Sequence, residues 1–239
     1  EERVDEIVQE FHLDEPMHTR YLLWLSDAVR GDLGRSAIQG QPVSEVIANA
    51  APTSLQLMLY AQVLALSVAV PAGVYAAYKA NRRGDRVTST MALAALSIPN
   101  FVLAVVLILF FALGGIRTGD TSLGSEWLPA ARYVPFGQDP VEHFRHMVLP
   151  AIALALGQAA GYMRILRSDM IGTLQENFIT TAKAKGVSDR RILWAHALRP
   201  SSFTLLTVFG VNTATLVGGA LIIETLFTLP GLGTVLGTA

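Results

Sequence analysis

The sequence contains no cysteine among its 239 residues, which excludes a disulfide framework and any metal site built on thiolates. It is also poor in charge, because Asp, Glu, Lys and Arg make up 15% of it, against about a quarter of an average soluble domain. Neither GxxxxGKS nor GxxxxGKT occurs, so the chain has no phosphate-cradling loop. With no catalytic triad and no convincing acid pair, we expect a non-enzymatic protein. Any energy that its function requires must then come from a partner or an ion gradient.

The charge that is present avoids the stretches 46–78, 87–116, 146–163 and 200–223. An uncharged apolar run of about 18 residues can cross a bilayer. Because backbone groups in hydrocarbon must satisfy their own hydrogen bonds, each run is predicted to be a helix. We therefore predict an all-α membrane protein with an outer segment, 1–50, and a transmembrane domain, 51–239. Its crossings are predicted at about 54–78, 87–113, 147–166 and 201–223.

Basic residues gather in two connecting segments, 79–86 and 164–199, which together carry 11 Lys or Arg and 4 acids. The rest of the chain carries 7 basic and 15 acidic residues. Because Lys and Arg collect on the cytoplasmic side, we predict that both segments are cytoplasmic, while 1–50 and 114–146 are extracytoplasmic. An outer amino-terminal segment without a signal peptide is most simply explained by a further crossing before it, and we expect another after the last residue.

The segment from Thr173 to Pro200 is predicted to form two short helices. Thr173 and Glu176 fit a capping box at the start of the first, and Gly186 is placed to end it in the left-handed conformation. Ser188 is predicted to cap a second helix over 189–198, which Pro200 closes. The first helix carries an apolar stripe made of Leu174, Phe178, Ala182 and the neighbouring Ile179. Such a helix either inserts into a groove of a soluble protein or lies on anionic lipid, and periodicity favours neither.

The stretch FITTAKAKGVSDRRILWAHALRP (178–200) resembles the cytoplasmic EAA loop of ABC importer permeases, in the form of the dipeptide, oligopeptide and nickel family. A Thr-Ala-(Arg/Lys)-Ala-Lys-Gly core is typical of that branch, and Thr181 to Gly186 match it. Further similar stretches are RYLLWLSDAVRGDLGRS (20–36), PTSLQL (52–57), LSIPNFVLAVVLILFFA (96–112), MVLPAIALAL (147–156) and GGALIIETLFTLPGLG (218–233). The chain departs from the general pattern in having Thr180-Thr181-Ala182 in place of Glu-Ala-Ala, and in placing Pro200 directly after Arg199.

The resemblance implies a helical bundle of the type I permease fold, with four of six expected crossings inside this chain. It implies a permease subunit of an ATP-driven, binding-protein-dependent importer of di- or oligopeptides, in the prokaryotic inner membrane. The implied partners are a second homologous permease subunit, two ATPase subunits, an extracytoplasmic peptide-binding protein and membrane lipid, with no nucleic acid. ATP and Mg are expected on the ATPase subunits, and neither a cofactor nor a metal on this chain.

The resemblance also makes 167–200 the coupling loop, through which an ATPase transmits its motion. The residues predicted to make this contact are Phe178, Thr181, Ala182, Lys183, Ala184, Lys185, Gly186, Ser188 and Asp189. A stand-alone secondary transporter or channel is the alternative; it predicts ionisable residues inside the crossings, whereas only edge acids such as Glu224 are present. The substrate stays open among dipeptides, longer peptides, glutathione and nickel chelates.

Polar residues inside the crossings are candidates for lining a route with donors and acceptors for peptide amides. They are Gln62, Asn100, Gln158, Asn212 and Thr215. Hydrogen bonding between helices is the alternative for each of them. Glu224, beside the fourth run, is interpreted as a contact for a substrate amine, a gate contact or a solvated rim position. Gly218-Gly219 is predicted to allow close helix approach or flexing, and packing is the favoured interpretation. His143-x-x-His146 is predicted to begin an interfacial helix rather than to bind metal.

Overall fold

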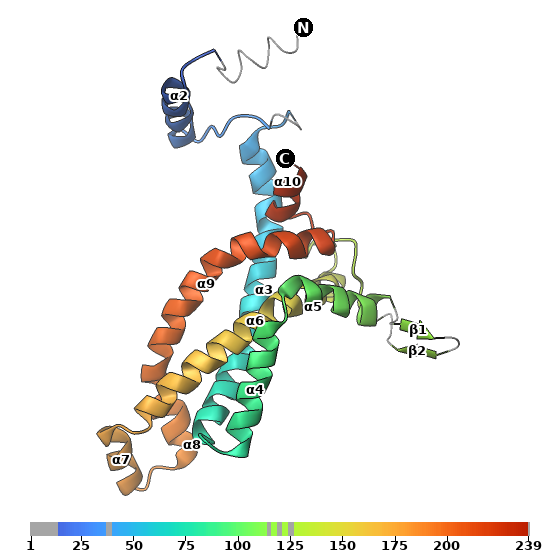
Figure 1. Ribbon diagram of the computed structural model, residues 1–239. Helices are drawn as coiled ribbons and strands as arrows, with labels where there is room; N and C mark the ends of the chain where they lie inside the picture. Colours follow the sequence, from blue (N-terminus) through green and yellow to red (C-terminus); the bar gives the residue numbers. More distant parts are fainter. Residues whose placement is uncertain (1–13, 37–39, 114–115, 119–120, 124–126, 239) are drawn as a thin grey trace.

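The computed structural model describes residues 14–36, 40–113, 116–118, 121–123 and 127–238 (Figure 1). Within these residues the regular secondary structure is helical apart from one short antiparallel hairpin and an isolated bridge between Arg35 and Pro42, so the predicted all-α architecture is confirmed. In chain order the elements are α2 Met17–Val29, α3 Val43–Tyr78, α4 Arg83–Ser97, α5 Asn100–Leu107, η1 Ile108–Ala112, β1 Ile116–Thr118, β2 Thr121–Leu123, α6 Pro140–Thr173, α7 Asn177–Ala184, α8 Asp189–Arg191, η2 Ile192–Ala197, α9 Leu198–Leu226 and α10 Leu232–Thr238. Parts of the predicted outer segments, among them residues 1–13, lie outside the described residues.

The core of the molecule is the contact between α3 and α6, which are each long and apolar enough to cross a membrane. Small side chains let the two backbones approach each other: Ala61, Ala65 and Ala69 repeat every fourth residue of α3, and all are at most 1% exposed. Gly73 continues this spacing, and a Cβ added to it would lie 3.1 Å from Leu166 Cδ2. A larger side chain at this position would therefore separate the two central helices.

Both central helices are longer than the crossings predicted within them, 54–78 and 147–166. At the start of α6 the Asp139 carboxylate accepts hydrogen bonds from the backbone N–H groups of Val141 and Glu142, at 2.9 and 3.1 Å. A proline follows this cap as the first helical residue, where its missing N–H costs nothing. Such a polar cap lets α6 begin before the apolar run, which a count of uncharged residues does not detect.

The predicted second crossing, 87–113, is a broken helix in the structure. Helix α4 and the helix formed by α5 and η1 meet at an angle of 94°. Pro99 causes the break, because its ring forces the preceding Ile98 into an extended conformation, with φ −93° and ψ 117°. The two halves together are long and apolar enough for one span.

The predicted fourth crossing, 201–223, lies within α9. That helix bends by 52° between Leu216 and Ala220. Gly218 lies in the bend, and a Cβ added there would meet no atom within 4 Å. Among the described residues nothing packs closely on Gly218, so the packing interpretation is wrong at this residue, and the helix changes direction there instead.

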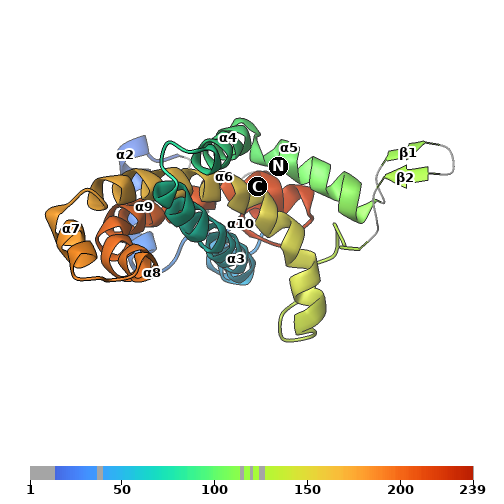
Figure 2. The same ribbon diagram turned by 90° about the horizontal axis from the view of Figure 1, so that it is seen from below.

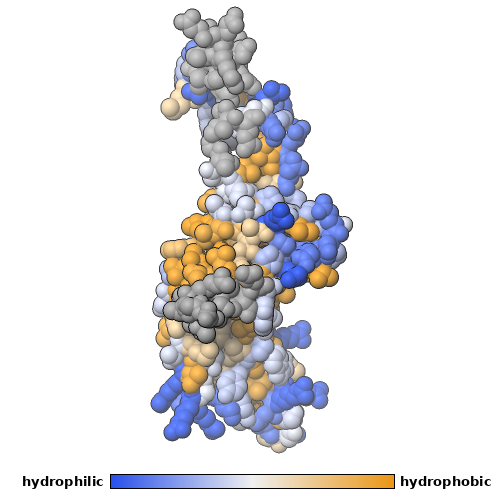
Figure 3. Space-filling view, turned by 90° about the vertical axis from the view of Figure 1, so that its right-hand side faces the viewer, coloured by the Kyte–Doolittle hydropathy of each residue, from blue (hydrophilic) through white to orange (hydrophobic). Residues whose placement is uncertain are grey.

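The two basic segments, 79–86 and 164–199, lie together at one end of the bundle, which we call the basic end (Figure 1). The Tyr78 hydroxyl donates to Asp189 there at 3.4 Å. Helix α10 and the start of α3 lie at the opposite, outer end (Figure 1). Figure 3 shows hydrophobic surface over the left side at mid-height, hydrophilic groups to its right, and hydrophilic groups projecting at the lower, basic end. The fold therefore brings together the segments that the charge pattern assigned to one side.

Candidate functional site

The first candidate site is α7, the short helix that projects at the basic end (Figure 2). It does not start at a capping box, and that prediction is wrong. Thr173 is the last residue of α6, where its hydroxyl pairs with the Ser201 hydroxyl at 2.9 Å. Glu176 occupies the capping position of α7 without a side-chain hydrogen bond. Packing of α6 on α9 carries α6 one turn further than the local sequence signal indicates.

The end of α7 follows the prediction. Gly186 has φ +77°, the left-handed conformation. Its N–H donates to the Lys183 carbonyl at 2.9 Å, and the Val187 N–H donates to the Ala182 carbonyl at 3.1 Å. This pair of bonds is a Schellman motif, which satisfies helix-terminal carbonyls and turns the chain sharply. The motif gives α7 a defined end and directs the chain back toward the membrane helices.

The predicted second helix, 189–198, does not stop at Pro200. A continuous helical path runs from Asp189 through η2 and α9. The helix is of the π type over η2, immediately before Pro200. A π turn shifts the hydrogen-bond pattern by one residue, which accommodates a residue that lacks an N–H and whose ring would otherwise clash with the preceding turn. Ser188 occupies the capping position of this helix, without a side-chain hydrogen bond.

Most residues predicted to contact an ATPase are exposed on α7 and the following turn. Ile179, fully buried, holds the helix against the bundle together with the buried Ile192 of η2. Phe178, the preceding residue, has 48% of its surface exposed. The exposed members of the predicted set are Phe178, Thr181, Lys183, Ala184, Lys185, Gly186, Ser188 and Asp189, and Ala182 is half-buried. We call this set the docking surface.

A bidentate ion pair ties the two basic segments together. Arg167 of α6 donates through Nε and Nη2 to the Asp85 carboxylate, with 2.7 Å between Nη2 and Oδ2. The N–H of Asn81 also donates to this carboxylate, at 2.8 Å, as does the Ser89 hydroxyl, at 3.2 Å. These donors, Arg167 first, lower the pKa of Asp85 to about 2 against the effect of burial. The pair was missed from sequence, although Asp85 is the only acid in its basic segment.

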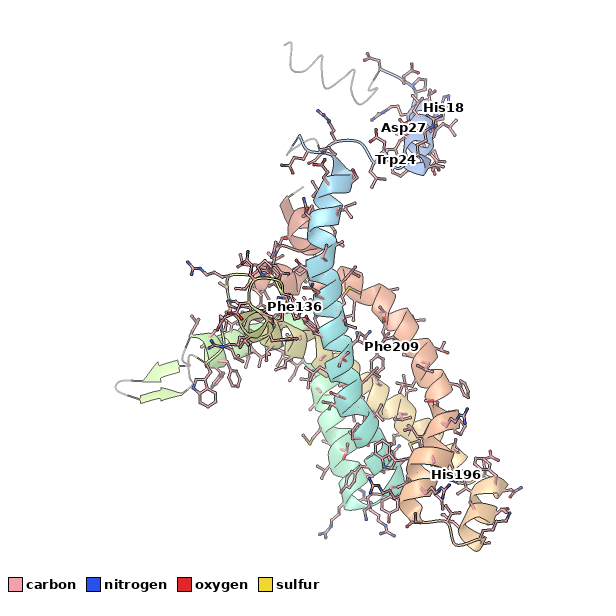
Figure 4. The ribbon with its side chains drawn as sticks, turned by 180° about the vertical axis from the view of Figure 1, so that it is seen from behind. His18, Trp24, Asp27, Phe136, His196 and Phe209 are labelled. Atoms are coloured by element: carbon pink, nitrogen blue, oxygen red, sulfur yellow. The ribbon has the colours of Figure 1, made fainter. Side chains whose placement is uncertain are left out.

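The second candidate site is a polar layer between α3, α6 and α9. Gln62 is 3% exposed, and its amide nitrogen donates to the Thr213 hydroxyl at 3.0 Å. Its carbonyl oxygen accepts from the Tyr162 hydroxyl at 2.9 Å. Phe209 of α9 lies beside Tyr162, with the ring centres 6.4 Å apart (Figure 4). Gln62 thus joins three helices, and a role in a transport path stays a prediction for it.

Three other predicted path residues lie together and are only partly buried. The Asn212 amide donates to the Gln158 carbonyl oxygen at 2.9 Å. Asn100 of α5 approaches Gly157, the neighbour of Gln158 in the chain: its Oδ1 would lie 3.4 Å from a Cβ added to that glycine. Thr215 is exposed on α9 and donates to the Asn212 carbonyl of its own helix at 2.9 Å. The proline break before α5 places Asn100 at this level.

Glu224, the last predicted path residue, is 1% exposed, so a solvated rim position is wrong. The turn after α9 folds over it, and the Gly233 N–H donates to its Oε2 at 2.6 Å. Its other carboxylate oxygen, Oε1, is buried without a hydrogen-bond partner among the described residues. Its sequence position beside a crossing gave no sign of this burial.

Comparison with known proteins gives one consistent family. The family described as "Binding-protein-dependent transport system inner membrane component" matches residues 69–239. A putative peptide transport system permease protein of Brucella abortus is 37% identical over 235 residues, which cover 98% of this chain and 72% of that protein. The oligopeptide transport system permease protein OppB of Haemophilus influenzae is 37% identical over 228 residues (95% and 69%), and AppB of Bacillus subtilis is 33% identical over 237 (96% and 70%).

This chain belongs to that family. It is therefore a non-catalytic inner membrane component of a binding-protein-dependent transport system, which works with a binding protein and with ATPase partners. The predicted family resemblance is confirmed, and so is the membrane location.

The two histidines of the His143-x-x-His146 pattern are held by protein groups. His143 is fully buried, and its Nδ1 donates to the Val134 carbonyl at 2.8 Å. Its Nε2 pairs with the Tyr60 hydroxyl at 3.1 Å, and Phe136 packs edge-on against its ring (Figure 4). His146 pairs with the carbonyl oxygen of Glu142 through Nδ1, at 2.7 Å. Both ring nitrogens of His143 are thus engaged in fixing the outer loop to α3 and α6.

Proposed function

We propose that this chain is the translocating permease subunit of an ATP-driven importer of di- or oligopeptides. The names of its relatives, which are peptide or oligopeptide transport permeases, support this substrate class. In this proposal a second homologous permease completes the path, and an outer peptide-binding protein delivers the substrate. Two ATPase subunits bind ATP and Mg, and one of them docks on the docking surface of this chain.

The coupling role is supported by the way α7 contacts the rest of the chain. Ile179 is buried against the bundle, while Phe178 and the lysines of the docking surface are exposed. Movement of α7 reaches the membrane helices along two routes. One is the continuous helical path from Asp189 into α9, and the other is the Thr173–Ser201 contact between α6 and α9. A helix that exposes an aromatic side chain beside cations is better suited to bind in a groove of a protein than a helix that exposes only charged side chains.

The proposed path is lined by partly buried amide side chains near the polar layer. Asn100, Gln158 and Asn212 carry both amide donors and carbonyl acceptors, and each is only partly buried. Such groups can exchange hydrogen bonds with a peptide backbone without an unpaired charge in the membrane. Selection among peptides is assigned to the binding protein and the path together.

The experiment is peptide uptake by the complete complex in proteoliposomes, with ATP inside and a set of dipeptides, longer peptides, glutathione and a nickel chelate outside. Phe178→Ala is expected to lower uptake and ATPase co-purification at least about fivefold, because exposed aromatic side chains often dominate interface energy. Phe203→Ala is the matched control, since Phe203 is 68% exposed on α9. Uptake that persists without ATP and collapses with the ion gradient would instead establish a secondary transporter.

A further inference from the structure

The turn between α9 and α10 is built around the side chain of Glu224. Besides the bond from Gly233 to Oε2, the Leu229 N–H donates to the Glu224 backbone carbonyl at 2.9 Å. Thr228 has φ +52°, a left-handed conformation that is unfavourable for a β-branched residue. The turn that folds back over the carboxylate therefore has a strained backbone at Thr228.

Two glycines give the carboxylate its space. A Cβ added to Gly231 would lie 2.7 Å from Oε1, and one added to Gly233 would lie 2.8 Å from Oε2. The second would also clash with the backbone of Leu221, which cannot move aside as a flexible side chain could. The PGLG sequence therefore fits the Glu224 carboxylate closely, and any side chain at Gly233 opens the turn.

The closed turn holds α10 against the outer end of α3. The Leu232 N–H donates to the Ser54 hydroxyl oxygen at 2.9 Å, and Phe227 and Leu229 are at most 2% exposed. Figure 1 shows α10 beside the upper part of α3. Ser54 lies eight residues before Gln62 on α3, about 12 Å along the helix axis. Helix α10 thus lies between the outer face and the polar layer.

In the closed arrangement only one of the two carboxylate oxygens, Oε2, has a hydrogen-bond donor among the described residues. Oε1 is buried and has no hydrogen-bond partner among the residues that the structure describes. Burying a carboxylate oxygen without a donor costs free energy, so the closed turn competes with any arrangement that gives Oε1 a donor or water. Strained and under-satisfied groups of this kind are typical of segments that change conformation during function.

We propose that Glu224 is a positioning residue that latches α10 over the outer end of the transport path, and that the latch opens in each transport cycle. The inference rests on the proposed transport function. The carboxylate holds α10 through Gly233 while no peptide passes. Opening moves α10 away from Ser54 and exposes the free Oε1 to water or to donors on the arriving peptide.

A reversible cross-link tests the opening without altering Glu224. Because these 239 residues contain no cysteine, Ser54→Cys with Leu232→Cys supplies the only thiols in this chain. In the complete complex, oxidation is expected to lower peptide uptake at least about tenfold, and a reductant is expected to restore it. The reduced double variant and each single variant are the controls. Full uptake by the cross-linked complex would overturn the latch, whereas absence of uptake by the wild-type complex would overturn the transport function itself.

The role of the carboxylate is tested by Glu224→Ala and Glu224→Gln in the same complex. Glutamine keeps an oxygen that can accept from Gly233, so binding-protein stimulation of the ATPase is expected to stay within about twofold of wild type. Alanine removes the latch, so the unstimulated rate is expected to rise and the stimulation ratio to fall severalfold. Gly233→Ala is expected to behave like Glu224→Ala. Equal, wild-type stimulation in all three variants would overturn the proposal.

Discussion

The basic end and the outer end of the molecule handle polar groups in opposite ways. At the basic end, α7 is held by a buried isoleucine and leaves its aromatic and cationic side chains exposed. At the outer end, Glu224 and His143 are buried at 1% and 0% exposure and are enclosed by turns of the same chain. One end therefore leaves its aromatic and cationic groups exposed, while the other end uses its polar groups to hold its own loops in place.

This difference indicates how the two ends respond to substitution. Exposed groups of the docking surface contribute little to the stability of the chain itself, because solvent satisfies them before a partner binds. Buried polar groups contribute more to stability, because removing one of them leaves its hydrogen-bond partner buried without a replacement from water. The Asp85–Arg167 pair is the exception at the basic end, since the Asp85 side chain is only 4% exposed.

Arg167→Ala is expected to have the largest effect. It leaves the Asp85 carboxylate buried without its main donor, and breaking a buried pair costs about 3–5 kcal/mol; with Arg167 itself 26% exposed, we expect about 3. Thermal unfolding of the detergent-solubilised chain measures the loss. Adding Asp85→Asn in the same chain is expected to recover part of it. An unchanged midpoint for Arg167→Ala would show that this pair behaves like an ordinary surface pair.

His143→Phe tests the outer end. It removes the partner of the Val134 carbonyl and of the Tyr60 hydroxyl but keeps a ring of similar size, so a loss of about 1–3 kcal/mol is expected. Limited proteolysis is expected to cut the loop 127–139 faster, with ATPase co-purification unchanged. His18→Phe is the matched control, because His18 is exposed on α2. Loss of ATPase binding in His143→Phe would remove the distinction between the two ends.

Gly186→Val tests the docking end without touching an exposed side chain. Valine at φ +77° carries a penalty of roughly 1–2 kcal/mol, which is relieved by reorganising the end of α7. Peptide-stimulated ATPase activity is expected to fall much more than the unfolding midpoint. Gly172→Ala serves as the control, because Gly172 lies in α6 with open space for a Cβ. Equal activity of the two variants would argue against α7 as the coupling element.

Thr215→Ala is expected to have the smallest effect on stability. Thr215 is exposed, and its hydroxyl bonds only to its own helix, so the change is expected to stay within about 0.5 kcal/mol. Thermal unfolding in detergent checks this value. A large loss of stability would show that Thr215 packs against a neighbour, and its assignment to the path would then have to be withdrawn.

Parts of the candidate sites could be read from single residues. Gly186 was predicted because only a residue without a Cβ readily ends a helix in the left-handed conformation. The partners of Gln62 could not be predicted, since Tyr162 and Thr213 lie 100 and 151 residues away along the chain. An adjacent polar residue, Thr213 beside Asn212, was the only local sign of that contact.

The existence of the membrane helices, the grouping of the basic segments and the family could all be predicted from the sequence. These follow from hydropathy, charge and motif, which act over short stretches of chain. The end of α6, the continuation of the helix through Pro200 and the enclosure of Glu224 depend instead on contacts between distant segments. The physical reason is that packing between distant segments and π-type hydrogen bonding can outweigh a local stop or cap signal. Burial of a side chain, likewise, is a property of the neighbours that the fold brings to it.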